Sequence, residues 1–438
     1  MSKAFRRTAL AAAALVALFT QRAAMQQQAP PPMPDTQTFG SLTVTKIADG
    51  LEMPWSLAFL PNGDMLVTEM PGRLRIIRNG VLDAKPIAGV PAVLYEPFAG
   101  LMDVVLHPDF AKNQYVYLSY NKMGPKLPDG EEPMNWRMTL GWSPGHVKHA
   151  PEKDRLTNST AIARARFDGT ALVDLKEIFV ANDWKDQSVA STTSARMAWG
   201  TDGKLYVTIG GANAPASNGK WRPVQGGVAQ DPTRHGGKVL RLNDDGTAPR
   251  DNPFVGKKGY LPEIYTMGLR NAVGLALNPA TGVMWEHENG PADGDELNIL
   301  KPGANYGWPL VGMGRDYMGD FIGGPNALHP TLGRKDASKM YMEGMEQPFL
   351  HWTPTVAPSG MMFYTGDKFE NWKGSLFIGQ LKGKKIERLS FTPTGGVNRR
   401  DYLLEALNRR IRDIRQGPDG WIYVVTDGKP GQVLRLTR

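Results

Sequence analysis

The chain has 438 residues, of which 41% are hydrophobic and 21% are charged, a composition that can bury a large core and excludes global disorder. It contains no cysteine, which excludes a disulfide framework and a thiolate metal site. The formal net charge of +8 favours anionic partners. No basic helix or arginine-rich run with interleaved aromatic residues is present, so a small anionic ligand explains this charge better than a nucleic acid does.

Residues 1–24 have the pattern of a secretory signal peptide. Arg6 and Arg7 precede an apolar run over residues 8–20, and small residues ending at Ala24 follow it. The paired arginines leave both the twin-arginine and the general secretory route open. No later segment approaches the about 20 apolar residues that a membrane-spanning helix needs. The sequence therefore predicts a bacterial protein that is periplasmic or secreted and has no membrane span.

A flexible linker is expected over residues 25–38, which are rich in Gln and Pro, and a single folded domain over residues 39–438. Within that domain one unit recurs, made of a β-rich apolar run, a turn of Pro, Asn, Asp or Gly, and a second β-rich run. Its copies are LAFLPNGDMLVTE from Leu57, VVLHPDFAKNQYVYLSY from Val104, MAWGTDGKLYVTIGG from Met197, LALNPATGVMWEHE from Leu275, FYTGDKFENWKGSLFIG from Phe363 and IRQGPDGWIYVVTD from Ile414.

The repeat predicts an all-β, six-bladed β-propeller, because strands recur at roughly 50 to 90 residues with almost no amphipathic helical pattern. A pair of β-sandwich domains is the alternative, although no change of composition divides the chain after the linker. A loop over about 121–158, rich in Pro, Gly and charged residues, follows the second copy, between a strand that ends near Tyr120 and one that begins near Thr160. Loops of this length in compact domains are usually functional or disordered.

An acidic segment, WEHENGPADGDELNILKPGANYGWP, runs from Trp285 to Pro309. Calcium prefers carboxylate and backbone carbonyl oxygens, and a Gly-Pro turn can direct successive carbonyls to one point. A calcium site is one interpretation of this segment. An acidic surface turn without metal is the other, because the spacing differs from that of an EF-hand loop. The acidic residues are Glu286, Glu288, Asp293, Asp295 and Glu296.

Three further segments carry basic or polar residues suited to an anionic ligand. In NRRIRD, Arg410 and Arg412 alternate on a strand and share a face, where two guanidinium groups suit a polycarboxylate, unless they pair with Asp413 or another acid. In LKGKKIERL, Lys382 follows an apolar strand at a turn, where a lysine is commonly just solvated. In GLRNAVGLAL, Arg270 and Asn271 precede a strand, where they either contact a ligand in the propeller channel or stabilise the turn.

Several ordered segments together resemble the glucose/sorbosone and aldose sugar dehydrogenases that depend on pyrroloquinoline quinone (PQQ). The resemblance runs from about residue 45 to the end. The segments are PWSLAFLPNGDMLVTE, GLMDVVLHPDFAKNQYVYLSY, AQDPTRHGGKVLRLNDDGTAPRDNPF, GLRNAVGLAL, NGPADGDELN, NYGWP and RIRDIRQGPDGWIYVVTD. The resemblance implies a six-bladed propeller that binds PQQ and Ca²⁺ at the top of its channel and oxidises sugars to lactones.

Carried over by position, the resemblance also implies individual roles. The residues expected to contact or support the cofactor are Lys382, Arg410, Arg412, Asp427, Arg270 and Asn271. The backbone carbonyls of Gly290 and Pro291 match those that hold the cofactor's calcium, while Glu296 and Tyr306 match a second, structural calcium site. PQQ carries three carboxylates, which agrees with the positive charges of Lys382, Arg410 and Arg412.

The sequence departs from the family pattern at the position of the general base. The family uses a histidine four residues before an arginine, and here Thr192 stands four residues before Arg196. A threonine hydroxyl is too weak a base to replace imidazole at neutral pH unless another group activates it. Three histidines could replace the base: His287, His146 and His149. Each of them is also interpretable as an ordinary surface or packing residue.

Two more departures fall on positions expected to contact the cofactor. Phe98 stands where a glutamine is expected, and Asn289 stands where histidine or glutamine is usual. The leading hypothesis is an oxidoreductase that transfers hydride from a sugar (aldose) or related alcohol to PQQ, with Ca²⁺, and passes electrons to an unidentified cytochrome or quinone. The alternatives are a calcium-dependent lactonase or hydrolase, and a PQQ- or carbohydrate-binding propeller that has lost catalysis.

Overall fold

The computed structural model describes residues 35–96, 98–126, 156–186, 194–211, 227–315 and 340–438. The predicted signal peptide, Thr192, His146 and His149 lie outside these residues. So does most of the predicted inserted loop.

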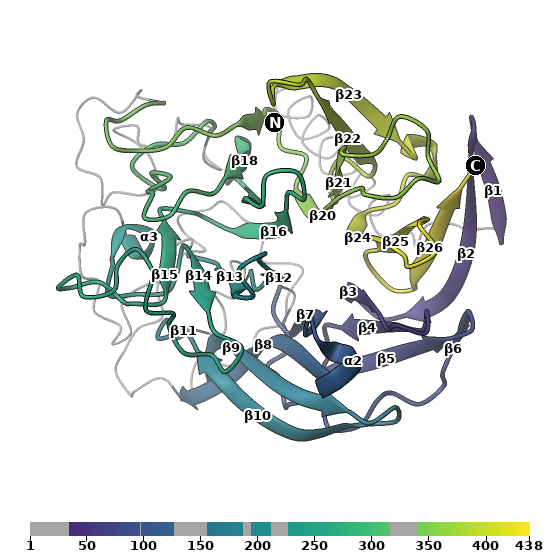
Figure 1. Cartoon of the computed structure of the whole chain (residues 1–438), viewed down its shortest axis with the longest axis horizontal. Helices are drawn as coiled ribbons and strands as arrows, with labels where there is room; N and C mark the ends of the chain where they lie inside the picture. The colour runs from purple at the N-terminus through teal and green to yellow at the C-terminus, as the bar shows by residue number, and fades with distance from the viewer. Residues whose placement is uncertain (1–34, 97, 127–155, 187–193, 212–226, 316–339) are drawn as a thin grey trace, which may run out of the picture. The chain divides into compact units, whose positions relative to one another are not determined.

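Six antiparallel sheets make up the described part of the chain (Figure 1). The first contains β3 (Pro54–Phe59), β4 (Met65–Glu69), β5 (Arg73–Arg78) and β6 (Val81–Leu82). The second contains β7 (Leu101–Leu106), β8 (Tyr115–Lys126), β9 (Leu156–Phe167), β10 (Leu172–Val180) and β11 (Lys185–Asp186). The third contains β12 (Met197–Trp199), β13 (Leu205–Ile209), β14 (Lys238–Leu242) and β15 (Ile264–Met267).

The other three sheets follow the same plan. The fourth contains β16 (Ala272–Leu277), β17 (Met284–Glu288), β18 (Asp295–Ile299) and β19 (Leu350–Trp352). The fifth contains β20 (Pro358–Phe363), β21 (Leu376–Gln380), β22 (Ile386–Phe391) and β23 (Val397–Leu403). The sixth contains β24 (Ile411–Gln416), β25 (Ile422–Thr426) and β26 (Gly431–Thr437), joined by β2 (Leu42–Leu51) and β1 (Thr36–Phe39) from the other end of the chain.

The first strands of the sheets form a closed ring. Each first strand contacts the first strand of the next blade: β3 contacts β7, β7 contacts β12, β12 contacts β16, β16 contacts β20, and β20 contacts β24. β24 in turn contacts β3. Figure 1 shows the six sheets arranged as blades around this ring. The predicted six-bladed β-propeller is therefore confirmed, and the alternative of two β-sandwich domains is wrong.

Each predicted repeat forms the two innermost strands of one blade. The copy that begins at Leu57, for example, spans β3 and β4, with Gly63 in a left-handed conformation in the turn between them (φ 91°). All five residues of β4 are buried, because blades stack on both faces of a sheet and leave neither face to solvent. Aromatic and aliphatic side chains fill the space between blades, as where Trp285 of β17 packs against Phe363 of β20.

The two ends of the propeller domain close the ring by strand pairing. β2 pairs with β26 in antiparallel register, with Val44 opposite Leu436 and Lys46 opposite Leu434. The predicted boundary of the linker is slightly wrong here, because β1 begins at Thr36 and pairs with β2 across a turn at Gly40. The backbone hydrogen bonds of this hairpin, rather than composition, set where the regular structure starts.

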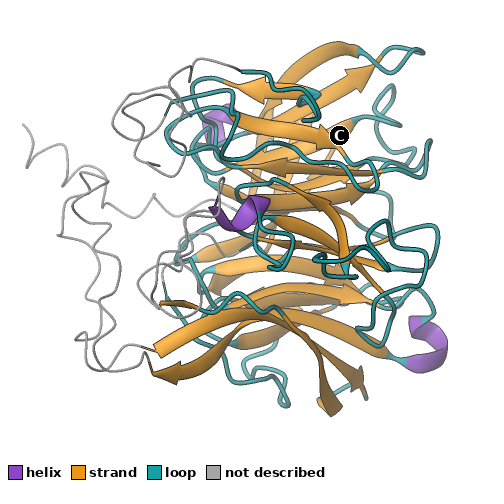
Figure 2. Cartoon of the chain, turned by 90° about the vertical axis from the view of Figure 1, so that its left-hand side faces the viewer, coloured by secondary structure: helices purple, strands orange, loops and turns teal. Residues whose placement is uncertain are grey.

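The second blade also differs from expectation at the inserted loop. β8 and β9 extend past the predicted ends near Tyr120 and Thr160, because they remain paired as far as Lys126 opposite Leu156. The described helices are short: α2 (Phe110–Asn113), α3 (Gly227–Gln230) and the 3-10 turn η4 (Glu405–Leu407). Figure 2 shows that strands dominate the described part of the chain. Within it, no helix has the length and apolar character needed to cross a membrane.

Candidate functional site

The residues that the sequence singled out lie at equivalent places in three neighbouring blades. Arg270 and Asn271 directly precede β16, and Asn289 directly follows β17. Lys382 follows β21, while Arg410 directly precedes β24. Asp427 directly follows β25. In an antiparallel hairpin the start of the first strand and the end of the second meet at one edge of the sheet, so the strand topology places these residues at the same edge of their blades.

Asp427 brings the two predicted arginines together. Its Oδ2 accepts a hydrogen bond from Arg410 Nε at 2.6 Å, and its Oδ1 accepts from Arg412 Nη2 at 2.7 Å. Burial acts to raise the pKa of Asp427, but the charges of Arg412 and Arg410 outweigh it and hold this pKa below its ordinary value. The sequence left open Asp413 or another acid as an internal partner of the arginines. The structure pairs them with Asp427.

Lys382 adds a further positive charge beside this pair. Its side chain is exposed, and its backbone N–H donates to the carbonyl of Val356 at 3.0 Å. The Nη1 atom of Arg410 lies 3.5 Å from the carbonyl oxygen of Leu381, which places the two turns side by side. Two arginines therefore flank one carboxylate, and Lys382 lies on the neighbouring turn, so this edge carries an excess of positive charge.

Arg270 lies on the turn that the family resemblance assigns to calcium. Its Nη1 donates to the carbonyls of Asn289 at 2.6 Å and Gly290 at 2.9 Å, and its guanidinium carbon lies 5.4 Å from the ring centre of Trp308. The Gly290 carbonyl thus already faces a positive charge, and a backbone carbonyl oxygen is a ligand type that calcium takes. A Cβ atom at Gly290 would stand 2.1 Å from the carbonyl of Asp293, so the turn needs glycine there. The turn fits a cation.

Acidic residues are buried beneath this turn. Glu288 accepts hydrogen bonds from the backbone N–H groups of Arg270 and Asn271. Burial raises the pKa of Glu288 to about 7, although these N–H groups oppose the shift. Burial also raises the pKa of Glu286 and of Glu296 well above the ordinary value, and the charge of Glu288 adds to the shift in both.

The second calcium site predicted at Glu296 and Tyr306 stays a prediction. A cation near Glu296 would relieve the repulsion among the buried carboxyls. The Tyr306 hydroxyl donates to the carbonyl of Ile299 at 2.7 Å and accepts from the N–H of Lys301 at 3.0 Å. No group of three or more His, Cys, Asp or Glu side chains in the described ranges is arranged as a metal site.

The position of His287 argues against its use as the general base. The side chain lies in β17 with 0% exposure, and its Nε2 contacts the carbonyl of Ser359 in the next blade. Gly274 leaves room for the ring, because a Cβ atom there would stand 2.1 Å from Nε2. Burial lowers the pKa of His287 to about 3. A base must reach the proton that it removes, and this ring is enclosed between β16 and β20.

The two departures at cofactor positions have different surroundings. Phe98 is 46% exposed in the short turn before β7. Asn289 is half-buried, and its Nδ2 donates to the carbonyl of Pro358 at 3.0 Å. Asn289 thus joins the fourth blade to the start of the fifth, a role that its place in the sequence did not indicate.

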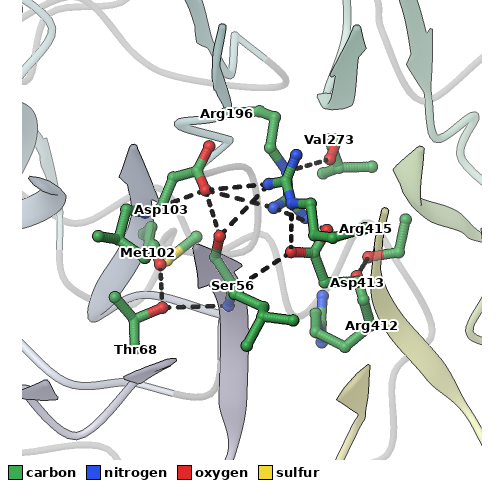
Figure 3. Close-up of polar contacts among 12 residues, drawn as sticks. Ser56, Thr68, Met102, Asp103, Arg196, Val273, Arg412, Asp413 and Arg415 are labelled. Carbon is green, nitrogen blue, oxygen red and sulfur yellow. Dashed lines mark hydrogen bonds and ion pairs between the residues drawn. The ribbon is translucent and has the colours of Figure 1, made fainter. Parts of the chain in front are cut away.

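A buried ion network on the innermost strands was missed by sequence reasoning (Figure 3). Arg196 Nη1 lies 3.4 Å from Asp103 Oδ1 and 3.2 Å from Asp413 Oδ1. Arg415 Nε lies 3.0 Å from Asp413 Oδ2, and Ser56 Oγ donates to Asp103 at 2.5 Å. The sequence gives no signal for it, because its members lie on different blades and are separated by up to hundreds of residues.

Comparison with known proteins agrees with this geometry. Residues 51–435 match the family model described as Glucose / Sorbosone dehydrogenase. The aldose sugar dehydrogenase YliI of Escherichia coli is 34% identical over 398 residues, which cover 91% of this chain and 93% of that protein. The quinoprotein glucose dehydrogenase B of Acinetobacter calcoaceticus is 29% identical over 433 residues, covering 87% of this chain and 84% of that protein.

A solved structure shows the same fold. The soluble aldose sugar dehydrogenase of Escherichia coli in its apo-form superposes with a TM-score of 0.72 at 34% identity, covering 91% of this chain and 99% of that one. The matched residues include the two innermost strands of all six blades, the arginines at Asp427 and the Gly290 turn. The chain therefore belongs to the glucose/sorbosone dehydrogenase family.

Proposed function

We propose that the protein is a PQQ- and calcium-dependent dehydrogenase that oxidises a sugar (aldose) or a related alcohol to a lactone or carbonyl product. The observation that carries this proposal is the cationic group at one edge of the last two blades, where Arg410 and Arg412 flank Asp427 and Lys382 stands exposed beside them. The names of the relatives support an oxidoreductase acting on sugars, and one of them is called a quinoprotein.

The charges of this group suit a cofactor with three carboxylates. Asp427 offsets one of the three positive charges of Arg410, Arg412 and Lys382, which leaves a net positive charge for an anionic ligand. Arginine binds carboxylates through two parallel N–H bonds, and a lysine supplies a compact charge with three donors. We assign Lys382, Arg410 and Arg412 to the cofactor's carboxylates, with Asp427 holding the two arginines in place.

The Gly290 turn is the proposed calcium site beside the cofactor. Its ligands would be the carbonyls of Gly290 and Pro291, and the Gly290 carbonyl already accepts from a cationic group. When bound, the cofactor and its calcium supply the hydride acceptor and polarise it. Arg270 lies within reach of the same turn and would stabilise negative charge that develops on the acceptor, while Asn271 orients it.

The proposal extends to the setting of the reaction. The first 24 residues support export to the periplasm or to the medium. Electrons would leave the reduced cofactor for a separate acceptor, a cytochrome or a quinone. The substrate would be a small sugar or alcohol that approaches the edge formed by the Gly290 turn and the cationic group.

Reconstitution tests the proposal. The apoprotein is titrated with PQQ at saturating Ca²⁺ and then assayed for dye reduction with a panel of aldoses and alcohols. We expect stoichiometric PQQ binding, a change in quinone absorbance on adding substrate, and dye reduction that chelation abolishes. Removing one charge in Lys382→Gln should weaken PQQ binding about tenfold, the order expected for a lost charge-assisted hydrogen bond.

The matched control is Lys373→Gln, which changes an exposed lysine of the same blade in the turn between β20 and β21, at the opposite edge. It should bind PQQ as the unmodified protein does. Failure of the protein to bind PQQ would overturn the proposal. Lactone hydrolysis with calcium alone would assign a hydrolase instead, and PQQ binding without turnover on any substrate would leave a binding protein.

A further inference from the structure

Asp295 links two turns of the candidate site through one buried carboxylate. It is the first residue of β18 and has 0% exposure. Its Oδ1 accepts from the N–H of Gly290 at 2.9 Å. Its Oδ2 accepts from the N–H groups of Val356 at 2.8 Å and Ala357 at 2.9 Å, and from the hydroxyl of Thr355 at 2.6 Å.

One side of this carboxylate fixes the Gly290 turn. Since Asp295 holds the N–H of Gly290, it sets the plane of the peptide that joins Asn289 to Gly290. Arg270 holds the carbonyl of that same peptide at 2.6 Å. The turn returns on itself closely enough that a Cβ atom at Gly290 would meet the Asp293 carbonyl at 2.1 Å. The direction of the Gly290 carbonyl therefore depends on the Asp295 contact.

The other side fixes the turn that carries Lys382. The carbonyl of Val356 accepts from the N–H groups of Lys382 and Gly383, each at 3.0 Å. The carbonyl of Ala357 accepts from the N–H of Leu381 at 2.9 Å. The N–H groups of these two residues point to Asp295, and their carbonyls point to the Lys382 turn. Residues 355–357 thus form a bridge from the carboxylate to the backbone of Lys382.

The contacts require a carboxylate rather than a group of the same shape. An ionised aspartate accepts hydrogen bonds with both oxygens, whereas asparagine accepts with one and presents an NH₂ group where the other stood. In the described ranges no lysine or arginine forms an ion pair with Asp295, so its charge is compensated by the N–H and hydroxyl donors alone. An NH₂ group on either side would face a donor and break one of the two connections.

We propose that Asp295 is a positioning residue that sets the calcium-binding turn and the cofactor-binding Lys382 turn relative to each other. This inference rests on the function proposed above. Asp295 itself contacts neither ligand, and it acts through the Gly290 peptide on one side and through residues 355–357 on the other. It joins the fourth blade, which supplies the metal ligands, to the fifth, which supplies Lys382.

Two binding measurements test the two connections separately. The first is calorimetric titration of the apoprotein with Ca²⁺ in the absence of PQQ, which reports on the Gly290 turn. The second is PQQ titration at saturating Ca²⁺, followed by tryptophan fluorescence. We expect Asp295→Asn to weaken calcium binding at least tenfold, whereas Lys382→Gln should leave calcium binding unchanged.

A double-mutant cycle on PQQ binding tests the Lys382 connection. If Asp295 positions Lys382, the two substitutions combined should weaken PQQ binding by clearly less than the product of their separate fold-changes, because each removes the same contact. Multiplicative effects would overturn this part of the inference. The connection to the Gly290 turn would be overturned if Asp295→Asn bound calcium as tightly as the unmodified protein does.

Thr355 provides a milder variant in case Asp295→Asn does not fold. Thr355→Val removes one donor to the carboxylate and should weaken calcium binding about threefold, while Thr355→Ser keeps the hydroxyl and should restore it. Equal calcium affinity in the valine and serine variants would contradict the inference. A role in stability alone would lower the melting temperature without changing either affinity.

The control for burial of a carboxylate is Asp64→Asn. Asp64 is 7% exposed, accepts from the N–H of Asn79 at 3.2 Å, and lies between β3 and β4 at the opposite edge of a blade. The Asp64→Asn variant should be less stable than the unmodified protein and should keep the affinities for calcium and for PQQ. If the unmodified protein binds neither calcium nor PQQ, the proposed function fails; if it binds both and Asp295→Asn matches it, only the present inference fails.

Discussion

Asp427 is the residue on which the cationic group depends, because one carboxylate holds two guanidinium groups. Its side chain is 6% exposed, against 13% for Arg412 and 44% for Arg410. The strand alternation predicted that the arginines share a side, yet the sequence alone did not select their partner, which lies 15 residues beyond Arg412. Only the family resemblance placed Asp427 in the same group.

Asp427→Asn is expected to lower the free energy of unfolding by about 1–3 kcal/mol at pH 7, because it leaves Arg412 without its charged partner in a largely buried position. The folded-state pKa of Asp427 lies below its ordinary value. Its contribution is therefore present above the unfolded-state pKa, about 4, and is lost as the pH falls through the lower folded-state pKa. The difference between variant and unmodified protein should shrink below pH 4.

Urea denaturation at several pH values between 3 and 7 measures this effect. Asp174→Asn serves as the control, since the Asp174 side chain is 72% exposed and pairs with Arg166, which is 43% exposed. The control should follow the unmodified protein at every pH. A stability difference for Asp427→Asn that stayed constant down to pH 3 would contradict the assigned role.

The strand β26 is the element that closes the ring, because it lies between β25 from its own end of the chain and β2 from the other. The sequence predicted the inner hairpins of the blades well, since alternating apolar residues and Gly, Asp or Asn turns are local signals. The outer strands were harder to predict. β19 has only three residues, and β10 carries irregularities in its pairing with β9, so neither shows a regular alternation.

Leu434→Ala tests the closure. Leu434 is fully buried in β26 opposite Val424 and Lys46, and truncation should lower the free energy of unfolding by about 2–4 kcal/mol because a cavity remains on the face of the sheet that its side chain covered. Val81→Ala in β6, where Val81 is 67% exposed, should change it by less than about 0.5 kcal/mol. Equal effects of the two substitutions in urea denaturation would show that closure does not depend on this packing.

At the scale of the whole molecule, the buried ion network ties blades together at their inner strands. Arg196 contacts Asp103 of the second blade and Asp413 of the sixth, and its Nε donates to the carbonyl of Val273 in the fourth at 3.2 Å (Figure 3). Its guanidinium also lies 3.9 Å from the ring centre of Trp55. Two arginines and two aspartates balance their charges here. Arg196, Asp103 and Asp413 are at most 1% exposed, and Arg415 is 22% exposed.

Arg196→Met removes one of these cations and leaves Asp103 and Asp413 with Arg415 alone. We expect a loss of about 3–5 kcal/mol in the free energy of unfolding, the usual consequence of breaking a buried ion pair on one side. Arg166→Met, which changes an arginine that is 43% exposed, is the control and should be close to neutral. Thermal unfolding of both variants provides the measurement, and similar melting temperatures would contradict a role for the network.

By itself the sequence determined the blade count, the inner hairpins and the chemical character of the candidate site. These follow from local signals: alternating apolar residues, turn residues, and basic or acidic segments at strand ends. The tertiary structure decided which distant groups meet, such as β2 with β26, Arg196 with Asp103 and Asp413, and Asp295 with residues 355–357. It also decided that His287 is enclosed between blades. Each of these depends on how one blade packs against another, and the residues that make such contacts are too far apart in the chain for any local pattern to specify them.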